Sequence, residues 1–214
     1  MPYPSKTDRQ TILSAAVKEL VQGSIRDLSL RNIAASLDLA PNAIYRYFSD
    51  RGALEAALAN EGARQLELAL RKAAHGREPI PAIRKMSSAY IRFAKAHRHL
   101  YDVMMSLHAS GHDATSHLSL WAFTVEQVQR IAGSNRAAQA SVALWAFLHG
   151  AVALEAAQVL GEIKPASGLE FGFEAWLMAV SKRGKPTAAL GIKPNKKRAS
   201  KKVSARERSV RSGK

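Results

Sequence analysis

The first 60 residues contain three short stretches in which apolar residues recur every three to four positions. This spacing places the apolar side chains on one face of an α-helix. Thr7 and Gln10 have the spacing of a capping box, so we expect the first helix to begin here and to end at Gly23. Between these limits the apolar stripe consists of Ile12, Leu13, Ala16, Val17 and Leu20.

Two shorter helices are predicted to follow. Ser29 is a natural N-cap for a helix of about two turns, in which Leu30, Ile33, Ala34 and Leu37 share one face. Asp38 tolerates the left-handed conformation of a tight turn. Pro41 suits the first position of a third helix, which carries Ile44 and Phe48 on one face. The pattern therefore predicts three short helices joined by tight turns.

The rest of the apolar pattern is also helical up to about residue 180. A long helix is expected from a cap at Ser49 to His75-Gly76, before the breakers Pro79 and Pro81. Further helices are predicted over residues 83–97, 100–107, 118–131, 136–160 and 169–180. No alternating run of β-branched residues and no internal repeat is present, so the predicted fold class is all-α.

The apolar periodicity disappears from residue 181 onward, where Lys, Arg, Ser, Gly and Pro dominate. Such a segment buries too little apolar surface to offset the entropy of ordering it, so we predict a disordered basic tail over residues 184–214. Residues 1–52 are expected to form a small helical domain. Residues 53–183 are expected to form a larger one, joined to the first by the long helix.

The net charge of +15 invites a nucleic-acid interpretation, but its distribution weakens that argument. Residues 185–214 contain eleven lysines and arginines and one glutamate, which places +10 of the charge in the tail. The first 60 residues carry only +1. A DNA-binding surface in the first domain must therefore be inferred from its pattern of residues.

Several classes of protein are disfavoured by what the sequence lacks. It contains no cysteine, which excludes disulfides, thiolate metal sites and cysteine nucleophiles. No apolar run approaches the roughly 18 residues of a membrane span, and MPYPSKTDRQ does not resemble a signal peptide, so we expect a cytoplasmic protein without membrane contact. Neither a phosphate-binding glycine loop nor a nucleophile motif indicates an enzyme, and no cofactor is expected.

The second and third predicted helices have the properties of a helix-turn-helix. This motif needs two short amphipathic helices locked by small and branched residues, with the outer face of the second free for the major groove. Ile33 and Ala34 are expected to pack against Ile44 and Phe48. The remaining surface of the third helix would then present Asn42, Ala43, Tyr45, Arg46 and Tyr47.

These residues resemble the first domain of the TetR family of transcriptional regulators, which runs T-x-R-x-I-A, L-G-V-S, L-Y-x-H/Y-F and K-x-x-L. The corresponding residues are Ser29 to Ala34, Leu37 to Ala40, Ile44 to Phe48 and Arg51 to Leu54. Two positions depart from the pattern: Asp38 replaces the turn glycine, and Ala40 replaces the serine that caps the recognition helix. The alternative is an ordinary three-helix bundle with partly buried tyrosines.

The resemblance implies a homodimer that binds double-stranded operator DNA. In this interpretation Tyr45 and Arg51 contact phosphates, Arg31, Asn42 and Arg46 reach base edges or nearby phosphates, and Tyr47 flanks the groove. The full set of expected DNA-contacting residues is Ser29, Arg31, Asn42, Tyr45, Arg46, Tyr47 and Arg51. Any single one of them is alternatively a solvated surface residue.

The larger domain also resembles a part of this family, because Trp145, His149 and Gly150 form a W-H-G signature that is typical of one subgroup. The resemblance implies dimerisation through about residues 136–160 and 169–180, and a cavity for an unidentified small-molecule effector. The predicted ligand-binding residues are Tyr90, Phe93, Tyr101, Met104, Met105, Trp121, Trp145 and His149. Each is alternatively a plain core residue, and small residues on these helices alternatively serve the monomer core.

Five histidines within about twenty residues raise the question of metal sensing: His97, His99, His108, His112 and His117. Gly111 interrupts the helix that would align two of them, so no metal site is predicted. The preferred hypothesis is a ligand-responsive repressor that acts as a homodimer. The alternative is a nucleoid-like architectural DNA-binding protein that relies on its basic tail.

Overall fold

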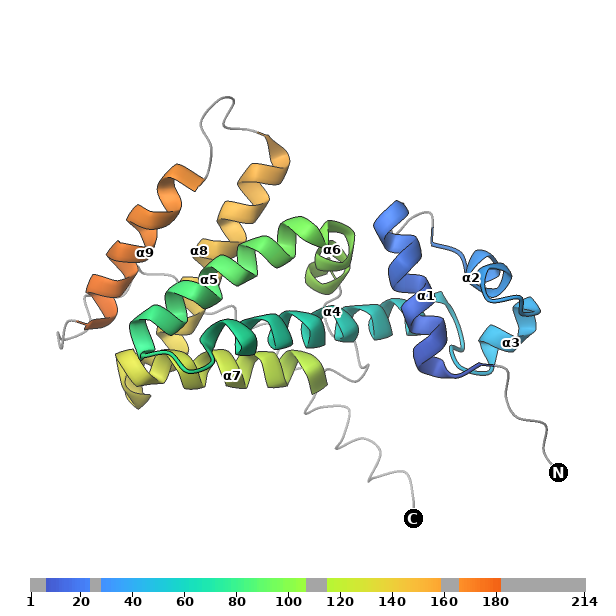
Figure 1. Cartoon of the computed structure of the whole chain (residues 1–214), viewed down its shortest axis with the longest axis horizontal. Coiled ribbons are helices and arrows are strands. Elements are labelled where there is room, and N and C mark those ends of the chain that lie inside the picture. Colours follow the sequence, from blue (N-terminus) through green and yellow to red (C-terminus); the bar gives the residue numbers. More distant parts are fainter. Residues whose placement is uncertain (1–6, 24–27, 107–114, 159–165, 182–214) are drawn as a thin grey trace, which may run out of the picture. The chain divides into compact units, whose positions relative to one another are not determined.

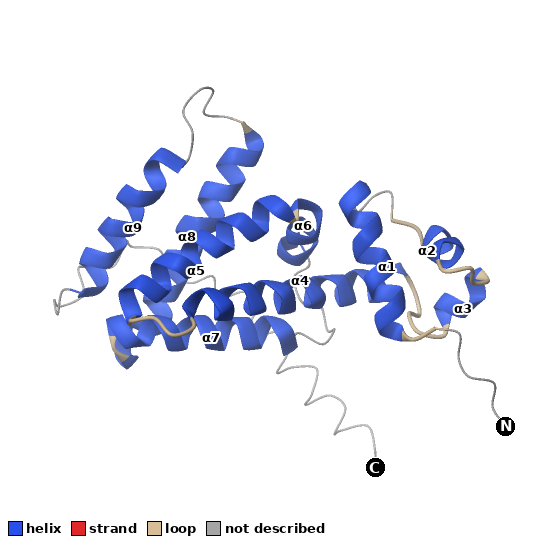
Figure 2. Ribbon diagram, viewed as in Figure 1, coloured by secondary structure: helices blue, strands red, loops and turns tan. Residues whose placement is uncertain are grey.

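The computed structural model describes residues 7–23, 28–106, 115–158 and 166–181 of the 214-residue chain. Over these ranges it contains helices and no strands, as Figures 1 and 2 show. The all-α class predicted from the sequence is confirmed. The predicted basic tail and the histidines at positions 108 and 112 lie outside the described residues.

The first three helices follow the predicted pattern. They are α1 (Arg9–Gln22), α2 (Leu30–Ser36) and α3 (Pro41–Tyr45). The N-cap of α1 is Asp8, one residue later than predicted, because its side chain accepts a hydrogen bond from the Thr11 N–H at 2.6 Å. Ser29 occupies the N-cap of α2 but makes no side-chain capping hydrogen bond, and Pro41 starts α3 as expected.

The long helix α4 (Arg51–Ala74) begins at a different cap from the predicted one. Asp50, not Ser49, is the N-cap, and its side chain accepts a hydrogen bond from the Ala53 N–H at 2.8 Å. A carboxylate there also complements the positive end of the helix dipole. The helix ends at Ala74 with His75 as its C-cap, and Gly76 follows with a φ of 66°, so the predicted end near His75-Gly76 is confirmed.

Three helices follow α4: α5 (Pro79–Ala96), α6 (Arg98–Ser106) and α7 (Thr115–Ala132). Pro79 and Pro81 were expected only to break the preceding helix, but both lie in the first turn of α5. Proline is tolerated there because the first N–H groups of a helix have no partner within it. In Figure 1, α5 and α7 run beside α4, and all three pack against one another.

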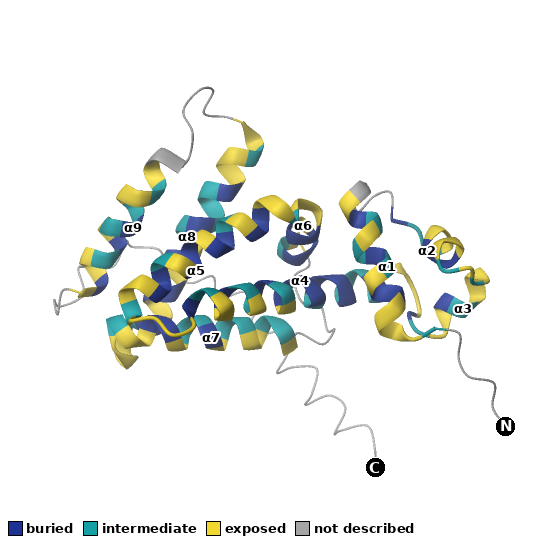
Figure 3. Ribbon diagram, in the orientation of Figure 1, coloured by how far each residue is buried: buried dark blue, intermediate teal, exposed yellow. Residues whose placement is uncertain are grey.

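The last two described helices are α8 (Ser134–Ala157) and α9 (Ala166–Ser181). They pack against each other, and α8 also packs against α5 and α7. By length and composition alone α8 could cross a membrane, but core helices of soluble proteins meet the same criterion. As Figure 3 shows, both helices alternate buried and exposed turns, so each has a face that the described chain does not cover.

One hydrophobic core extends through both predicted domains. In α1 to α4 it includes Ile12, Ile33, Ile44, Phe48 and Leu54, each no more than 1% exposed. The inward packing predicted for α2 and α3 is therefore confirmed. The core continues along α4 and into α5 to α9, and α6 connects the two regions because it packs against both α1 and α4.

Candidate functional site

The turn between α2 and α3 is closed by two backbone hydrogen bonds. The Leu39 N–H donates to the Ala34 carbonyl at 2.9 Å, and the Asp38 N–H donates to the Ala35 carbonyl at 3.1 Å. With Asp38 at a φ of 53°, this is the Schellman arrangement that usually has glycine at the left-handed position. Asp38 thus performs the role of glycine, and α2 and α3 are held as a helix-turn-helix.

The outer face of this motif presents polar side chains. Arg31, Asn42 and Arg46 are exposed, and Tyr45 is 53% exposed, while Ile44 and Phe48 on the opposite face of α3 are buried. Guanidinium and amide groups can pair with base edges, and hydroxyl groups can contact phosphates. The exposed face therefore has the chemistry that a recognition helix requires.

Two of the predicted DNA-contacting side chains have partners within the protein. The Tyr47 hydroxyl donates to the Thr7 carbonyl at 2.7 Å, which ties the end of α3 to the residue before the N-cap of α1. Arg51 donates through Nε to Glu55 Oε1 at 2.7 Å, one helical turn further along α4. Both pairs are at the surface or partly buried, where such contacts contribute little and are readily exchanged.

An apolar cavity lies between helices of the larger region. Its volume is about 320 Å³, and its walls come from five helices, α4 to α8. Two aromatic side chains, Trp121 and Trp145, approach each other with ring centroids 6.0 Å apart. The described residues that line it are Leu66, Leu70, Ile83, Met86, Ser87, Tyr90, Met104, Met105, His117, Leu120, Trp121, Thr124, Leu144, Trp145 and Leu148.

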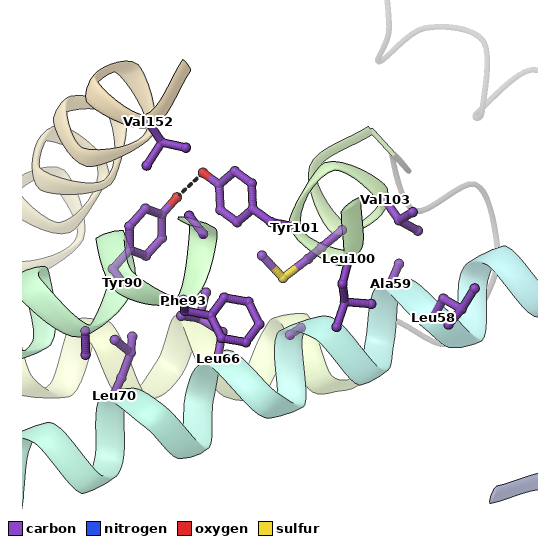
Figure 4. Close-up of a cluster of buried hydrophobic side chains, with 14 of the residues drawn as sticks. Leu58, Ala59, Leu66, Leu70, Tyr90, Phe93, Leu100, Tyr101, Val103 and Val152 are labelled. Atoms are coloured by element: carbon purple, nitrogen blue, oxygen red, sulfur yellow. Dashed lines mark hydrogen bonds between the residues drawn. The ribbon is translucent and has the colours of Figure 1, made fainter. Parts of the chain in front are cut away.

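One side of this cavity is held by a chain of three hydrogen bonds, which the backbone of α8 closes into a ring. Trp145 donates through Nε1 to the Tyr90 hydroxyl at 3.1 Å, the Tyr90 and Tyr101 hydroxyls are 2.7 Å apart, and Tyr101 lies 2.6 Å from His149 Nδ1. Figure 4 shows the two tyrosine hydroxyls pointing toward each other. Because Trp145 and His149 lie one turn apart on α8, the ring ties α5 and α6 to α8.

The two tyrosines of this ring are neutral phenols in the folded protein. Burial, more than any neighbouring charge, raises the pKa of Tyr90 well above its usual value of 10.0. Burial likewise raises the pKa of Tyr101, although the hydrogen bond from Tyr90 opposes this change. The two tyrosine hydroxyls thus stay protonated and hydrogen-bond to each other within an apolar wall.

Comparison with known proteins identifies the fold. A family model described as "Bacterial regulatory proteins, tetR family" matches residues 12–58, and one described as "Tetracyclin repressor-like, C-terminal domain" matches residues 83–175. Together the two models match more than half of the chain. The chain belongs to the TetR family.

Solved structures of similar fold support this assignment. A protein of unknown function from Rhodococcus sp. RHA1 shares 25% identity over 85% of this chain and all of that one, with a TM-score of 0.73. A TetR variant from Acinetobacter baumannii AYE, solved in complex with minocycline, shares 17% identity over 81% of this chain and 96% of that one, with a TM-score of 0.61. No curated protein matches the chain.

As a TetR-family protein, the chain is a DNA-binding transcriptional regulator, and regulators of this family are not enzymes. The family models cover the helix-turn-helix and the segment with Trp145, His149 and Gly150. The individual contacts of Ser29, Arg31, Asn42, Tyr45, Arg46, Tyr47 and Arg51 with DNA stay predictions.

The structure brings together five of the eight residues predicted to bind the ligand of this TetR-family protein. Tyr90, Met104, Met105, Trp121 and Trp145 line the cavity. The other three are not part of its wall: Tyr101 and His149 belong to the hydrogen-bonded ring behind Tyr90, and Phe93 is buried with its ring 4.8 Å from that of His97.

Sequence reasoning missed several cavity residues. His117 was considered only as a metal ligand, and Met86 and Ser87 were not considered at all. No pattern in the sequence marks them, because the wall combines residues from helices that are distant along the chain. In the part of the chain that the structure describes, no group of three His, Asp or Glu side chains is arranged to hold a metal ion.

Proposed function

We propose that this TetR-family protein is a ligand-responsive repressor that binds a palindromic operator as a homodimer in the cytoplasm. The observation that carries the proposal is the apolar cavity of about 320 Å³, whose size and lining suit a small molecule. Two of the helices that form its wall also connect to the DNA-binding region: α4 is the next helix after α3 along the chain, and α6 packs against α1.

The DNA-binding role of the outer face is supported by exposure and chemistry. Arg31, Asn42 and Arg46 reach base edges or adjacent phosphates, and Tyr45 and Arg51 contact phosphates. Ser29 and Tyr47 lie at the margins of this surface. Arg51 exchanges its carboxylate partner Glu55 for a phosphate when DNA binds. The short recognition helix α3 of one chain contacts too few base pairs to specify an operator. Two chains related by a two-fold axis read two half-sites.

Dimerisation is supported by the apolar faces of α8 and α9. Only 33% of the most apolar 18-residue stretch of α8 is buried within one chain. Val142 and Leu154 on this helix are 53% and 45% exposed. On α9, Phe171 and Met178 are 81% and 57% exposed. In stable proteins, apolar faces of this kind are covered by a partner. Under two-fold symmetry, the same faces of two copies of the chain can cover each other.

The response to a ligand is supported by close packing between α6 and α4. A Cβ atom at Gly62 on α4 would lie 3.3 Å from Leu100 Cγ and 3.4 Å from Met104 Cβ on α6. Met104 also lines the cavity. A ligand that displaces Met104 therefore shifts α6 against α4, and the population moves toward dimers whose recognition helices no longer match the groove spacing.

The experiment that tests this proposal begins with selection of bound genomic fragments by the purified protein. A palindrome among the selected fragments is expected, with half-sites one or more helical turns apart. Fluorescence anisotropy then measures the affinity for this operator with and without ligands that raise the thermal stability of the protein. A stabilising ligand that lowers operator affinity supports the proposal, and one that leaves it unchanged is not an effector.

A second candidate function, an architectural DNA-binding protein, is favoured by the charge of +10 in residues 185–214. Truncation after residue 184 separates the two. A repressor keeps its discrimination between operator and random DNA and loses some salt-sensitive affinity, because counterion release by the tail is independent of sequence. An architectural protein loses nearly all of its binding.

A further inference from the structure

The polar groups in the cavity wall differ in whether the protein already satisfies them. The Ser87 hydroxyl donates to the Ile83 carbonyl at 2.9 Å, and the Thr124 hydroxyl donates to the Leu120 carbonyl at 2.8 Å. The Tyr90 hydroxyl belongs to the ring with Trp145 and Tyr101. Ser87 and Thr124 therefore already use their hydroxyl protons within the protein, and their oxygens can still accept a hydrogen bond from a ligand.

His117, in the first turn of α7, is different. Its Nε2 atom is buried, and no group in the described part of the chain lies within hydrogen-bond distance of it. A buried polar atom without a partner is costly and uncommon in folded proteins. Because His117 lines the cavity, a polar atom of a bound molecule is well placed to remove this cost.

The charge of the wall restricts the ligand further. No Asp, Glu, Lys or Arg is present among the described lining residues. A charged group moved from water into such surroundings loses its hydration without gaining an opposite charge. An uncharged ligand is therefore favoured over a carboxylate or an amine.

The volume and the lining of the cavity also restrict the size and shape of the ligand. A cavity of about 150 Å³ holds a benzene ring, so the volume of about 320 Å³ holds roughly twelve non-hydrogen atoms. Trp121 and Trp145 provide flat aromatic surfaces, and Met86, Met104 and Met105 provide thioether groups that adapt to a ring and contact it favourably.

On the basis of the proposed function, we propose that the effector is an uncharged aromatic molecule of about two fused rings whose single hydroxyl or carbonyl group hydrogen-bonds to His117 Nε2. His117 is then the residue that selects a polar over an apolar ligand. The aromatic and thioether side chains supply most of the affinity.

Isothermal calorimetry on the full-length protein tests this with three probes of similar size: 2-naphthol, 2-methylnaphthalene and 2-naphthoate. The wild type is expected to bind 2-naphthol about tenfold more tightly than either of the others. His117→Leu is expected to weaken binding of 2-naphthol about tenfold and to leave 2-methylnaphthalene unchanged. His117→Gln retains a donor and acceptor and should restore most of the preference.

His99→Leu is the matched control, because His99 is exposed on α6 and does not line the cavity. It should bind all three probes like the wild type. Equal wild-type affinities for 2-naphthol and 2-methylnaphthalene, tighter binding of 2-naphthoate, or a preference that survives in His117→Leu would each overturn the inference. Circular dichroism verifies that every variant is folded.

Failure of this inference is distinguishable from failure of the proposed function, because operator affinity is measured separately. If another ligand releases DNA while 2-naphthol binds without dependence on His117, only the assignment of the ligand class is wrong. If 2-naphthol binds with the expected dependence on His117 and operator affinity does not change, the binding site is supported and its role as an effector site is overturned.

Discussion

At the scale of single residues, the turn of the helix-turn-helix depends on the backbone of Asp38. A non-glycine residue at a φ of 53° carries steric strain between its Cβ atom and the backbone, although aspartate tolerates this region better than most residues. Asp38→Gly is therefore expected to raise the free energy of unfolding by about 0.5 kcal/mol, the relief of strain being partly offset by the greater entropy of unfolded glycine. Urea denaturation measures the change.

Leu37→Gly is the control for this substitution, because Leu37 lies in the same turn at a φ of −106°. Glycine relieves no strain there and removes a partly buried side chain, so the variant should be less stable than the wild type. A loss of stability in Asp38→Gly would show instead that the carboxylate makes a stabilising contact.

A second prediction at this scale concerns the buried phenol of Tyr90 and alkaline pH. Because burial raises the pKa of Tyr90, the folded state holds the phenolic proton more tightly than the unfolded chain does. Its contribution to stability is fully present below pH 10 and is lost as the pH rises above that value. Tyr90→Phe should therefore lower stability by about 1 kcal/mol at neutral pH, and its stability should fall less steeply above pH 10.

Trp145→Phe is the control for the pH dependence. It removes the hydrogen bond from Nε1 to the Tyr90 hydroxyl but no titratable group. This variant should lose stability at neutral pH and keep the steep alkaline dependence of the wild type. Parallel pH profiles for wild type and Tyr90→Phe, measured by urea denaturation between pH 7 and pH 11, would contradict the explanation.

At the scale of elements, most helices could be predicted from the sequence because their apolar periodicity and end signals agree. Gly76 and Pro41 mark helix ends where they were expected. The errors are local. Asp8 and Asp50 cap their helices in place of the neighbouring Thr7 and Ser49, and a choice between adjacent capping residues depends on which side chain reaches a free N–H in the folded chain.

The cavity was less predictable than the helices. Aromatic residues and methionines in α5 to α8 serve equally well as core or as cavity lining, and only the folded arrangement separates Tyr90 from Phe93. The unpaired Nε2 atom of His117 is also a property of three-dimensional packing. The helix-turn-helix was easier to predict, because its residues lie close together in the sequence.

The contact between α8 and α9 leads to a prediction at the element scale. A Cβ atom at Gly172 would overlap the Phe147 ring, at Cε2 and Cζ. Gly172→Ala is therefore expected to lower the free energy of unfolding by about 1–3 kcal/mol, because the partly buried Phe147 ring has to move. Thermal and urea denaturation measure the loss.

Gly168→Ala, on the same helix, is the matched control. Nothing lies within 4 Å of its added Cβ atom, so the higher helix propensity of alanine should leave stability unchanged or raise it by up to about 1 kcal/mol. Replacing Phe147 by Leu in the Gly172→Ala background should recover part of the loss. Equal effects at both glycines would show that helix propensity, not packing against Phe147, governs this interface.

At the scale of the whole molecule, two basic side chains of α5 pair with acidic side chains of α8 and α9. Arg84 on α5 pairs with Glu170 and Glu174 on α9 and lies 4.6 Å from the centre of the Phe173 ring, and Lys95 pairs with Glu155 on α8 at 2.7 Å. These ion pairs are partly exposed, so each contributes little alone. The side of α9 that faces the monomer core carries the buried Phe173, Trp176 and Val180, and Phe171 lies on the opposite, exposed side.

The proposed homodimer gives the last prediction. Phe171→Lys places a charge at a side chain that is 81% exposed in one chain, so the new lysine is solvated and the monomer should stay folded. In a two-fold dimer the substitution occurs twice in one interface, and burying it should weaken dimerisation by about 2 kcal/mol or more. Sedimentation velocity should show a shift from dimer to monomer, and operator affinity should fall with it, since only the dimer holds two recognition helices.

Leu68→Lys is the matched control. Leu68 lies on α4, away from α8 and α9, and is 54% exposed, so this variant should stay dimeric and bind DNA. Dissociation by both variants would indicate general destabilisation, and dimerisation by both would exclude Phe171 from the interface.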